Sequence, residues 1–302
     1  YLKLVLSARG NLFPTRDFPC CCDNLASMLV NGIPQTNIAL SDRGLLYGDG
    51  VFETFLCERG QPLLFELHMQ RLQRGCQRLS LSLQDASVIR QEIEQVAANK
   101  DCVIRVSVTR GERVRGYRYE RTDTSFNRIV MVDDHRPSPE TNYQQGITLH
   151  LCQHRLPRQA ALAGIKHLNR LDQVLARSEW DREYAEGLLL NDLGEVIEGC
   201  MSNLFVLRDN VWMTPDLSNS GVDGVMREHL LEIASDCGQK CQVANLQLAD
   251  LLQAEAMFLC NSVIGIWPVR SFQQQQYDSV IKAQPFMQHL HEKLSVLYPV
   301  GS

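Results

Sequence analysis

The chain has 302 residues, which is long enough for a large hydrophobic core in one or two domains. Hydrophobic residues make up 44% and charged residues 22%, as is typical of a globular protein in water. The formal net charge of −5 argues against a nucleic-acid-binding surface, which is normally basic, but allows a local basic pocket for an anionic small molecule.

The number and spacing of the cysteines and the hydropathy of the chain indicate the cellular compartment of the protein. The 11 cysteines are an odd number, and the run Cys20-Cys21-Cys22 has no second pair at the spacing of a zinc site. The apolar run at residues 2–8 is too short for a membrane span of roughly 20 residues, and Cys20 lacks a cleavage context for a signal peptide. We expect a cytoplasmic protein with reduced cysteines, no metal, no membrane contact and no nucleic-acid partner.

Residues 1–27 differ from the rest of the chain. They show no clean hydrophobic period and crowd two prolines and three cysteines together, before Met28 opens a plausible strand. We interpret this stretch as an atypical extension outside the fold, and possible origins are a translated upstream segment or a remnant of cloning. A genuine N-terminal arm is the alternative.

The first half of the chain predicts a smaller α/β domain at residues 28–132. Asn31-Gly32 is a strong turn dipeptide and predicts a hairpin. The elements that follow are expected to be a loop at 41–44, a strand at 51–57, helices at 68–79 and 87–99, and strands at 103–109 and 129–132. Two prolines among polar residues at 133–145 indicate the interdomain connection.

Residues 146–302 predict a larger second domain, rich in antiparallel hairpins. The expected strands are 147–152, 188–191 with 195–198, 204–207 with 211–214, and 257–261. A helix near residue 170 is expected to bury the stripe Leu168, Leu171, Val174 and Leu175. Further helices are expected from Gly224 to Cys237 and at 284–297. The whole is an α+β (mixed α/β) layout without a GxGxxG motif or a P-loop.

Lys166 and Glu198 are the residues most suggestive of chemistry. A lysine in an apolar segment just before a helix can have a lowered pKa and act as a Schiff-base nucleophile. A glutamate held nearby can keep a pyridine nitrogen protonated, and together these are the needs of a pyridoxal phosphate enzyme. Taken alone, Lys166 is more simply a solvated surface lysine, and Glu198 is more simply an ordinary glutamate of an edge strand.

Two further segments are suited to binding an anion. In residues 221–228 (GVDGVMRE), glycines before a helix leave backbone N–H groups free, and the helix dipole attracts negative charge. Arg71 lies beside the apolar face of its predicted helix, and a partly buried arginine needs an anionic partner, either a phosphate or a structural carboxylate. A plain glycine-rich helix entry remains the alternative for the first segment.

The chain from residue 28 to 302 resembles the fold-type IV pyridoxal phosphate enzymes, the group of branched-chain and D-amino-acid aminotransferases. The likeness is carried by SDRG at 41–44, by GDGVFET at 48–54 and by the arginine helix HMQRL at 68–72. It implies a two-domain, D-amino-acid aminotransferase-like fold with the cofactor pyridoxal 5'-phosphate in the cleft between the domains. It also implies a homodimer.

Three stretches are similar to the aminodeoxychorismate lyases of this group: GIKHLNRL at 164–171, GVDGVMR at 221–227, and Arg110-Gly111 followed by Arg115-Gly116-Tyr117. Aminotransferases usually have threonine where Met226 stands, and D-amino-acid aminotransferases tend to have tyrosine in place of Phe52. A fold-type IV aminotransferase acting on D-amino or branched-chain amino acids is the alternative, and a non-catalytic scaffold protein is a more distant one.

The resemblance assigns roles to individual residues. Lys166 would be the catalytic Schiff-base lysine, and Arg115 and Tyr117 would contact substrate carboxylates, whereas His167 is interpreted as structural. The cofactor-binding residues are expected to be Lys166, Arg71, Glu198, Val225, Met226, Asn261 and Ser262. The implied reaction converts 4-amino-4-deoxychorismate into pyruvate and 4-aminobenzoate, a folate precursor. Because the substrate is labile, functional coupling to aminodeoxychorismate synthase is a further possibility.

Overall fold

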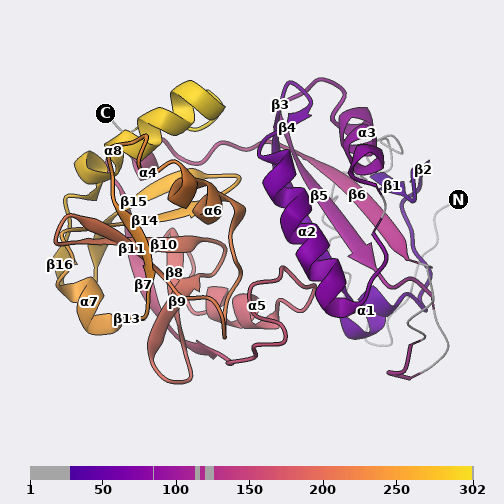
Figure 1. Cartoon of the computed structure of the whole chain (residues 1–302), viewed down its shortest axis with the longest axis horizontal. Helices are drawn as coiled ribbons and strands as arrows, with labels where there is room; N and C mark the ends of the chain where they lie inside the picture. The colour runs from indigo at the N-terminus through magenta and orange to yellow at the C-terminus, as the bar shows by residue number, and fades with distance from the viewer. Residues whose placement is uncertain (1–27, 84, 113–115, 120–125, 301–302) are drawn as a thin grey trace, which may run out of the picture.

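The computed structural model describes residues 28–83, 85–112, 116–119 and 126–300 and contains two β-sheets (Figure 1). The predicted extension at residues 1–27 lies outside the described residues. The N-terminal sheet has six strands in the order β2-β1-β6-β5-β3-β4, and the C-terminal sheet has ten. Alternating apolar residues and turn dipeptides in the sequence predicted this α+β class. The structure confirms it.

The N-terminal sheet is antiparallel throughout. Its strands are β1 (Met28–Val30), β2 (Ile33–Pro34), β3 (Gly50–Glu58), β4 (Gln61–Pro62), β5 (Cys102–Thr109) and β6 (Asn127–Asp134). The helices of this half are α1 (Arg43–Tyr47), α2 (Phe65–Leu79) and α3 (Ala86–Ala97). Helices α2 and α3 bury apolar faces against the sheet, and Phe55, Leu72 and Ile89 lie in their common core.

The C-terminal sheet is mixed, because β7 pairs in parallel with both β15 and β8. Its strands are β7 (Ile147–Leu156), β8 (Glu186–Asn191), β9 (Glu195–Gly199), β10 (Asn203–Arg208), β11 (Val211–Pro215), β12 (Cys241–Ala244), β13 (Leu246–Gln247), β14 (Ala256–Asn261), β15 (Gly265–Phe272) and β16 (Gln275–Gln276). Its helices are α4 (Thr141–Gln144), α5 (Leu171–Arg177), α6 (Val225–Glu232), α7 (Leu248–Leu252) and α8 (Ser279–His289), which continues into a π-helical turn (Leu290–Leu294). The rings of Trp212, Phe205, Phe258 and Phe286 pack against one another in its core.

The two halves meet where α2 packs against α6 (Figure 1). Strand β6 ends at Asp134 and β7 begins at Ile147, so the predicted connection at residues 133–145 holds α4 and the last two residues of β6. The domain division at 28–132 and 146–302 stays a prediction. None of the helices in the described part of the chain has the length and apolar character that a membrane span requires.

Three sequence expectations about helices are corrected. Of the stripe expected to be buried, Leu168 is half-buried before α5, but Leu171, Val174 and Leu175 on α5 have exposed fractions of 74%, 59% and 54%. Helical periodicity identifies an apolar face but not whether another element of the same chain covers it. Helix α6 ends at Glu232 rather than near Cys237, and the expected loop at 41–44 already contains the start of α1.

The described cysteines are free thiols, and Cys57, Cys76, Cys102, Cys152 and Cys260 are buried. The free thiols agree with the expectation of reduced cysteines, and the buried ones act as small core residues.

Candidate active site

A cavity of about 820 Å³ lies at the junction of the two halves. Phe52 and Arg71 line it from the N-terminal half, and Lys166, Glu198 and Val225 line it from the C-terminal half. The structure thus brings the predicted lysine, glutamate, arginine and helix start to one place. A volume of this size is in the range of small-molecule and cofactor sites.

Lys166 is carried by an irregular segment that backbone hydrogen bonds tie to β3. The N–H of Phe52 donates to the carbonyl oxygen of Lys166 at 2.9 Å, and the N–H of Leu168 donates to that of Gly50 at 3.0 Å. A Cβ on Gly50 would meet the Val108 carbonyl oxygen of β5 at 2.4 Å and Leu168 Cδ1 at 2.7 Å, so glycine leaves room for Leu168 beside β3. The lysine is therefore fixed by a regular strand of the other half.

The loop before α6 holds the same segment from its other side. Gly164 N–H donates to the Gly221 carbonyl at 2.9 Å, and Asp223 N–H donates to the Gly164 carbonyl at 3.0 Å. Lys166 therefore lies between the start of β3 and the start of α6, two elements that are distant in sequence.

The environment of Lys166 favours its neutral amine. Burial, followed by the positive charge of Arg71, lowers its pKa to about 8, although Glu53 opposes the shift. Its Nζ lies 4.7 Å from the ring centroid of Phe52. The amine is consequently far easier to deprotonate than an ordinary lysine, as a Schiff-base nucleophile requires.

Glu198, on β9, is buried in the cavity wall. Burial raises its pKa to about 7, against the opposing effects of the Val222 N–H, Arg170 and Lys166. Its Oε2 accepts a hydrogen bond from the Val222 N–H at 2.8 Å. Gly221 makes room for this contact with φ +84, and an added Cβ would meet Glu198 Oε2 at 3.1 Å. The carboxyl group can therefore share a proton with a basic nitrogen near neutral pH.

Helix α6 presents its N-terminus to the cavity. Its N-cap is Gly224, which has no side chain to cap the helix, and Val225 lines the cavity. An added Cβ on Gly224 would lie 1.7 Å from Asn203 Oδ1. The Met226 side chain is fully buried in the core, so Met226 can reach an anion only through its backbone.

Arg71 has the anionic partner that the sequence analysis required, and it is a carboxylate. Its Nε and Nη2 bind the two carboxylate oxygens of Glu53, on β3, at 2.8 and 2.5 Å, and its Nη1 donates to the Asp223 carbonyl at 3.0 Å. His68 Nδ1 lies 2.7 Å from Glu53 Oε2. Burial alone would raise the pKa of Glu53, but the charge of Arg71 and these hydrogen bonds lower it to about 2.

Sequence reasoning missed Glu53. The available signal was a charged residue inside the otherwise apolar run of β3, eighteen positions before Arg71. Arg71 still lines the cavity, so the glutamate orients the guanidinium without removing it from the site.

Asn261 and Ser262 form the turn between β14 and β15 and line the cavity. Asn261 Oδ1 accepts the N–H groups of Val263 and Ile264 at 2.8 and 2.9 Å. Ser262 Oγ donates to the Thr54 carbonyl at 3.0 Å. The turn is therefore preorganised, and contact with a cofactor phosphate stays a prediction.

The two residues predicted to contact substrate carboxylates are not placed in the cavity. Arg115 lies outside the described residues. Tyr117 is not among the cavity-lining residues, its side chain is 82% exposed, and its ring packs against Tyr47 with 5.3 Å between centroids.

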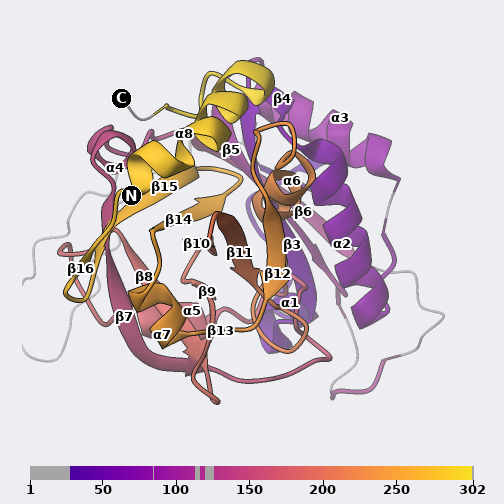
Figure 2. The same cartoon turned by 60° about the vertical axis from the view of Figure 1, so that its left-hand side comes forward.

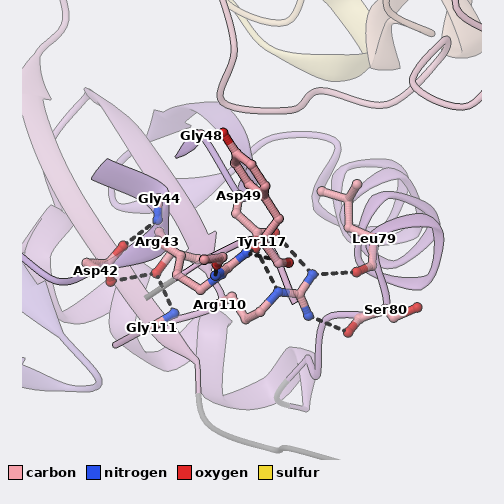
Figure 3. Close-up of polar contacts among 12 residues, drawn as sticks. Asp42, Arg43, Gly44, Gly48, Asp49, Leu79, Ser80, Arg110, Gly111 and Tyr117 are labelled. Atoms are coloured by element: carbon pink, nitrogen blue, oxygen red, sulfur yellow. Dashed lines mark hydrogen bonds and ion pairs between the residues drawn. The ribbon is translucent and has the colours of Figure 1, made fainter. Parts of the chain in front are cut away.

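The loop that carries Tyr117 is anchored by an arginine pair on Asp49 (Figure 3). Arg43 Nε and Arg110 Nε each bind Asp49 Oδ2, at 2.9 and 2.8 Å. Arg43 also donates to the carbonyls of Gly116 and Tyr117 at 2.6 and 3.2 Å. Burial would raise the pKa of Asp49, but its bonds to Arg110 and Arg43 lower it.

A family model described as "Amino-transferase class IV" matches residues 50–272. The chain belongs to this family. An aminodeoxychorismate lyase of Vibrio harveyi is 36% identical over 243 residues, 80% of this chain and 89% of that protein.

Solved structures extend the likeness. The 4-amino-4-deoxychorismate lyase of Pseudomonas aeruginosa superimposes with a TM-score of 0.83 at 42% identity, over 88% of this chain and 99% of that one. A hypothetical aminotransferase of Mycobacterium tuberculosis in a PLP-bound form has a TM-score of 0.73 at 22% identity, over 86% of this chain and 96% of that one, which shows a shared fold.

Proposed function

We propose that this protein is a 4-amino-4-deoxychorismate lyase that uses pyridoxal 5'-phosphate to form 4-aminobenzoate and pyruvate. The observation that carries the proposal is one cavity in which a lysine with a pKa of about 8 and a buried glutamate with a pKa of about 7 both line the wall. The high similarity to the lyases of Vibrio harveyi and Pseudomonas aeruginosa supports the choice of reaction.

The residues present fit pyridoxal phosphate. The uncapped start of α6 at Val225 and Met226 offers backbone N–H groups to a phosphate, and Arg71 adds a positive charge beside it. Asn261 and Ser262 line the same cavity. When bound, the cofactor supplies an electron-accepting ring.

The protein residues would divide the proton transfers of the reaction. Lys166 would hold the cofactor through its amine, and once that amine is free it would take the C4 proton of the substrate as general base. The same residue then gives a proton to the leaving enolpyruvyl group, which departs as pyruvate. Glu198 holds a proton at the pyridine nitrogen throughout, since its raised pKa keeps the proton available at neutral pH.

Substrate contacts and the pathway setting are further parts of the proposal. Arg115 and Tyr117 would bind substrate carboxylates, with Arg43 holding the Tyr117 backbone and Asp49 holding Arg43. A cytoplasmic enzyme that is coupled to aminodeoxychorismate synthase would limit loss of the labile substrate.

A homodimer would cover the exposed apolar face of α5, formed by Leu171, Val174 and Leu175. Val174 also lines the cavity, so a second copy on this face would lie next to the site. Light scattering should give twice the 34.3 kDa chain mass, and Leu175→Glu should halve it. A monomeric wild-type protein would contradict this proposal.

The reaction itself is tested by absorbance and product analysis of the purified protein. We expect a visible–ultraviolet band that borohydride removes, followed by pyruvate and 4-aminobenzoate in equal amounts when aminodeoxychorismate is generated in place. The band with amino-group transfer to an α-keto acid, and without pyruvate, would identify an aminotransferase, the other activity consistent with the family. No band would contradict the cofactor assignment.

A further inference from the structure

The turn between β14 and β15 is tied to a tyrosine near the end of the described residues. The Tyr298 hydroxyl donates to the Ser262 carbonyl oxygen at 2.7 Å. Its ring packs against Gly265, where an added Cβ would lie 2.8 Å from Tyr298 Cδ1. Tyr298 is fully buried, and burial raises the pKa of its hydroxyl, which therefore stays protonated and can donate. One side chain thus contacts both the middle and the end of this turn.

The segment that carries Tyr298 is itself well anchored. It follows α8 and its π-helical turn, and both views show α8 lying over β14 and β15 (Figures 1 and 2). His291 Nδ1 donates to the Tyr298 carbonyl oxygen at 2.9 Å, and the Tyr298 N–H donates to the Ser295 carbonyl oxygen at 3.1 Å. The tyrosine is therefore held by its own segment and can act as a fixed point for the turn.

Ser262 is held from three directions. The carbonyl oxygen of its peptide bond with Val263 accepts the Tyr298 hydroxyl, and the N–H of the same peptide bond donates to Asn261 Oδ1 at 2.8 Å. The Ser262 Oγ donates to the Thr54 carbonyl oxygen, on β3, at 3.0 Å. Both polar groups of one peptide unit are therefore bound, which fixes the orientation of its plane.

One neighbour of Ser262 is the anchor of Arg71. Ser262 binds the carbonyl oxygen of Thr54, and the residue immediately before Thr54 is Glu53, the glutamate that binds the Arg71 guanidinium. Arg71 and Ser262 both line the cavity. Adjacent residues of β3 therefore hold the arginine and the serine.

The other neighbour is the loop that leads into α6. Cys260, two residues before Ser262, is the strand partner of Asn203 on β10. The Asn203 side chain donates to the Val222 carbonyl oxygen at 2.9 Å and lies directly beside Gly224, the N-cap of α6. The end of β14 therefore lies against the start of α6, which is suited to binding an anion. The turn, the anchor of Arg71 and the start of α6 converge on one side of the cavity.

We propose that Tyr298 is a positioning residue for the cofactor phosphate, because it holds the Ser262 peptide in the orientation in which the turn meets that phosphate. The inference rests on the proposed function, which places pyridoxal phosphate in the cavity. Tyr298 is not among the cavity-lining residues, so it acts through Ser262 and not by contact with the ligand. Without its hydroxyl, the buried Ser262 carbonyl loses a donor, and the peptide plane is no longer fixed.

Dissociation constants for two forms of the cofactor test this role in the apoprotein. Pyridoxal phosphate and pyridoxal share the aldehyde that reacts with Lys166, but only the first has a phosphate. We expect Tyr298→Phe to raise the Kd of pyridoxal phosphate about fivefold or more and to leave that of pyridoxal within about twofold. Tyr277→Phe is the matched control, since it also removes a tyrosine hydroxyl that donates to a carbonyl oxygen, that of Leu251. Both constants should stay at their wild-type values in this control.

Inorganic phosphate provides a second measurement on the same proteins. It should compete with pyridoxal phosphate for the wild-type apoprotein and about fivefold less strongly for Tyr298→Phe, whose fold is checked by circular dichroism. Equal losses of affinity for pyridoxal phosphate and pyridoxal would show a purely structural role and overturn the inference. Unchanged constants in Tyr298→Phe would also overturn it. If wild-type protein shows no cofactor band, the proposed function fails instead.

Discussion

Phe52 holds Lys166 through both its backbone and its ring. The Phe52 N–H donates to the Lys166 carbonyl oxygen at 2.9 Å, and the ring centroid lies 4.7 Å from Lys166 Nζ. The backbone bond fixes an irregular segment to strand β3, while the aromatic ring covers the amine without accepting a strong hydrogen bond. The lysine is therefore positioned, and its amine stays available for reaction.

Replacement of Lys166 by alanine should abolish both 4-aminobenzoate formation and the bound-cofactor band, because no other amine is assigned to the Schiff base. Loss of more than 10³-fold in kcat is expected, in line with removal of a covalent and acid–base group. Product analysis and absorbance measure the two effects. Wild-type turnover in the variant would refute the mechanism.

Association of pyridoxal phosphate with the apoprotein should accelerate as pH rises and level off above about 8. Only the unprotonated amine adds to an aldehyde, and the pKa of Lys166 is lowered to about 8. At pH 7 about a tenth of the amine is then unprotonated, against less than a thousandth for an ordinary lysine. Stopped-flow absorbance at constant ionic strength gives the profile. A rate that still climbs about sevenfold between pH 9 and 10 would show an unshifted lysine.

Glu198→Gln should reduce kcat by about 10²-fold or more, the usual scale of an acid–base group, with a much smaller effect on cofactor affinity. Glutamine keeps the shape and can still accept the Val222 N–H, but it cannot supply a proton to the ring nitrogen. Glu186→Gln is the control: Glu186 lines the same cavity, but its carboxylate accepts from Gly187, Met201 and Ser202. Equal losses in the two variants would contradict the special role of Glu198.

Gly224→Ala should weaken cofactor binding more than tenfold with the fold retained. The new methyl would lie 1.7 Å from Asn203 Oδ1, so either the start of α6 or the Asn203 side chain, which donates to the Val222 carbonyl, must shift. Equilibrium dialysis gives the affinity, and circular dichroism checks the fold. Gly194→Ala, at a glycine with open space around its Cβ, controls for a general effect of added methyl groups and backbone strain. Unchanged affinity for the cofactor would show that the start of α6 does not bind the cofactor phosphate.

Glu53→Gln should destabilise the apoprotein by about 3–5 kcal/mol, because it leaves Arg71 as an uncompensated buried charge. Urea denaturation measures this loss, and Glu53→Gln combined with Arg71→Met should recover part of it. The native pKa of about 2 lies below the ordinary value, so the stabilisation is present above pH 4.5 and is lost as pH falls toward 2. A wild-type acid transition identical to that of the variant would contradict the assignment.

Local sequence patterns determined the secondary structure well. Alternation in β5 and β6, the Asn31-Gly32 turn and the helical spacing in α2 are properties of neighbouring residues, and the structure has these elements within a few positions of prediction. The chemical types of Lys166 and Glu198 also suggested their reaction before their positions were known. Their pairing in one cavity required the fold.

Only the tertiary structure decided which charges are compensated and which apolar faces are covered. Arg71 forms a buried ion pair with Glu53, whereas Arg170 Nε is buried without a hydrogen-bond partner in the described part of the chain. The sequence predicted a buried apolar stripe on α5, but this face is exposed in the structure. Burial and ion pairing depend on contacts between segments far apart in sequence, which local periodicity does not encode, and these same contacts set the pKa values of Lys166 and Glu198.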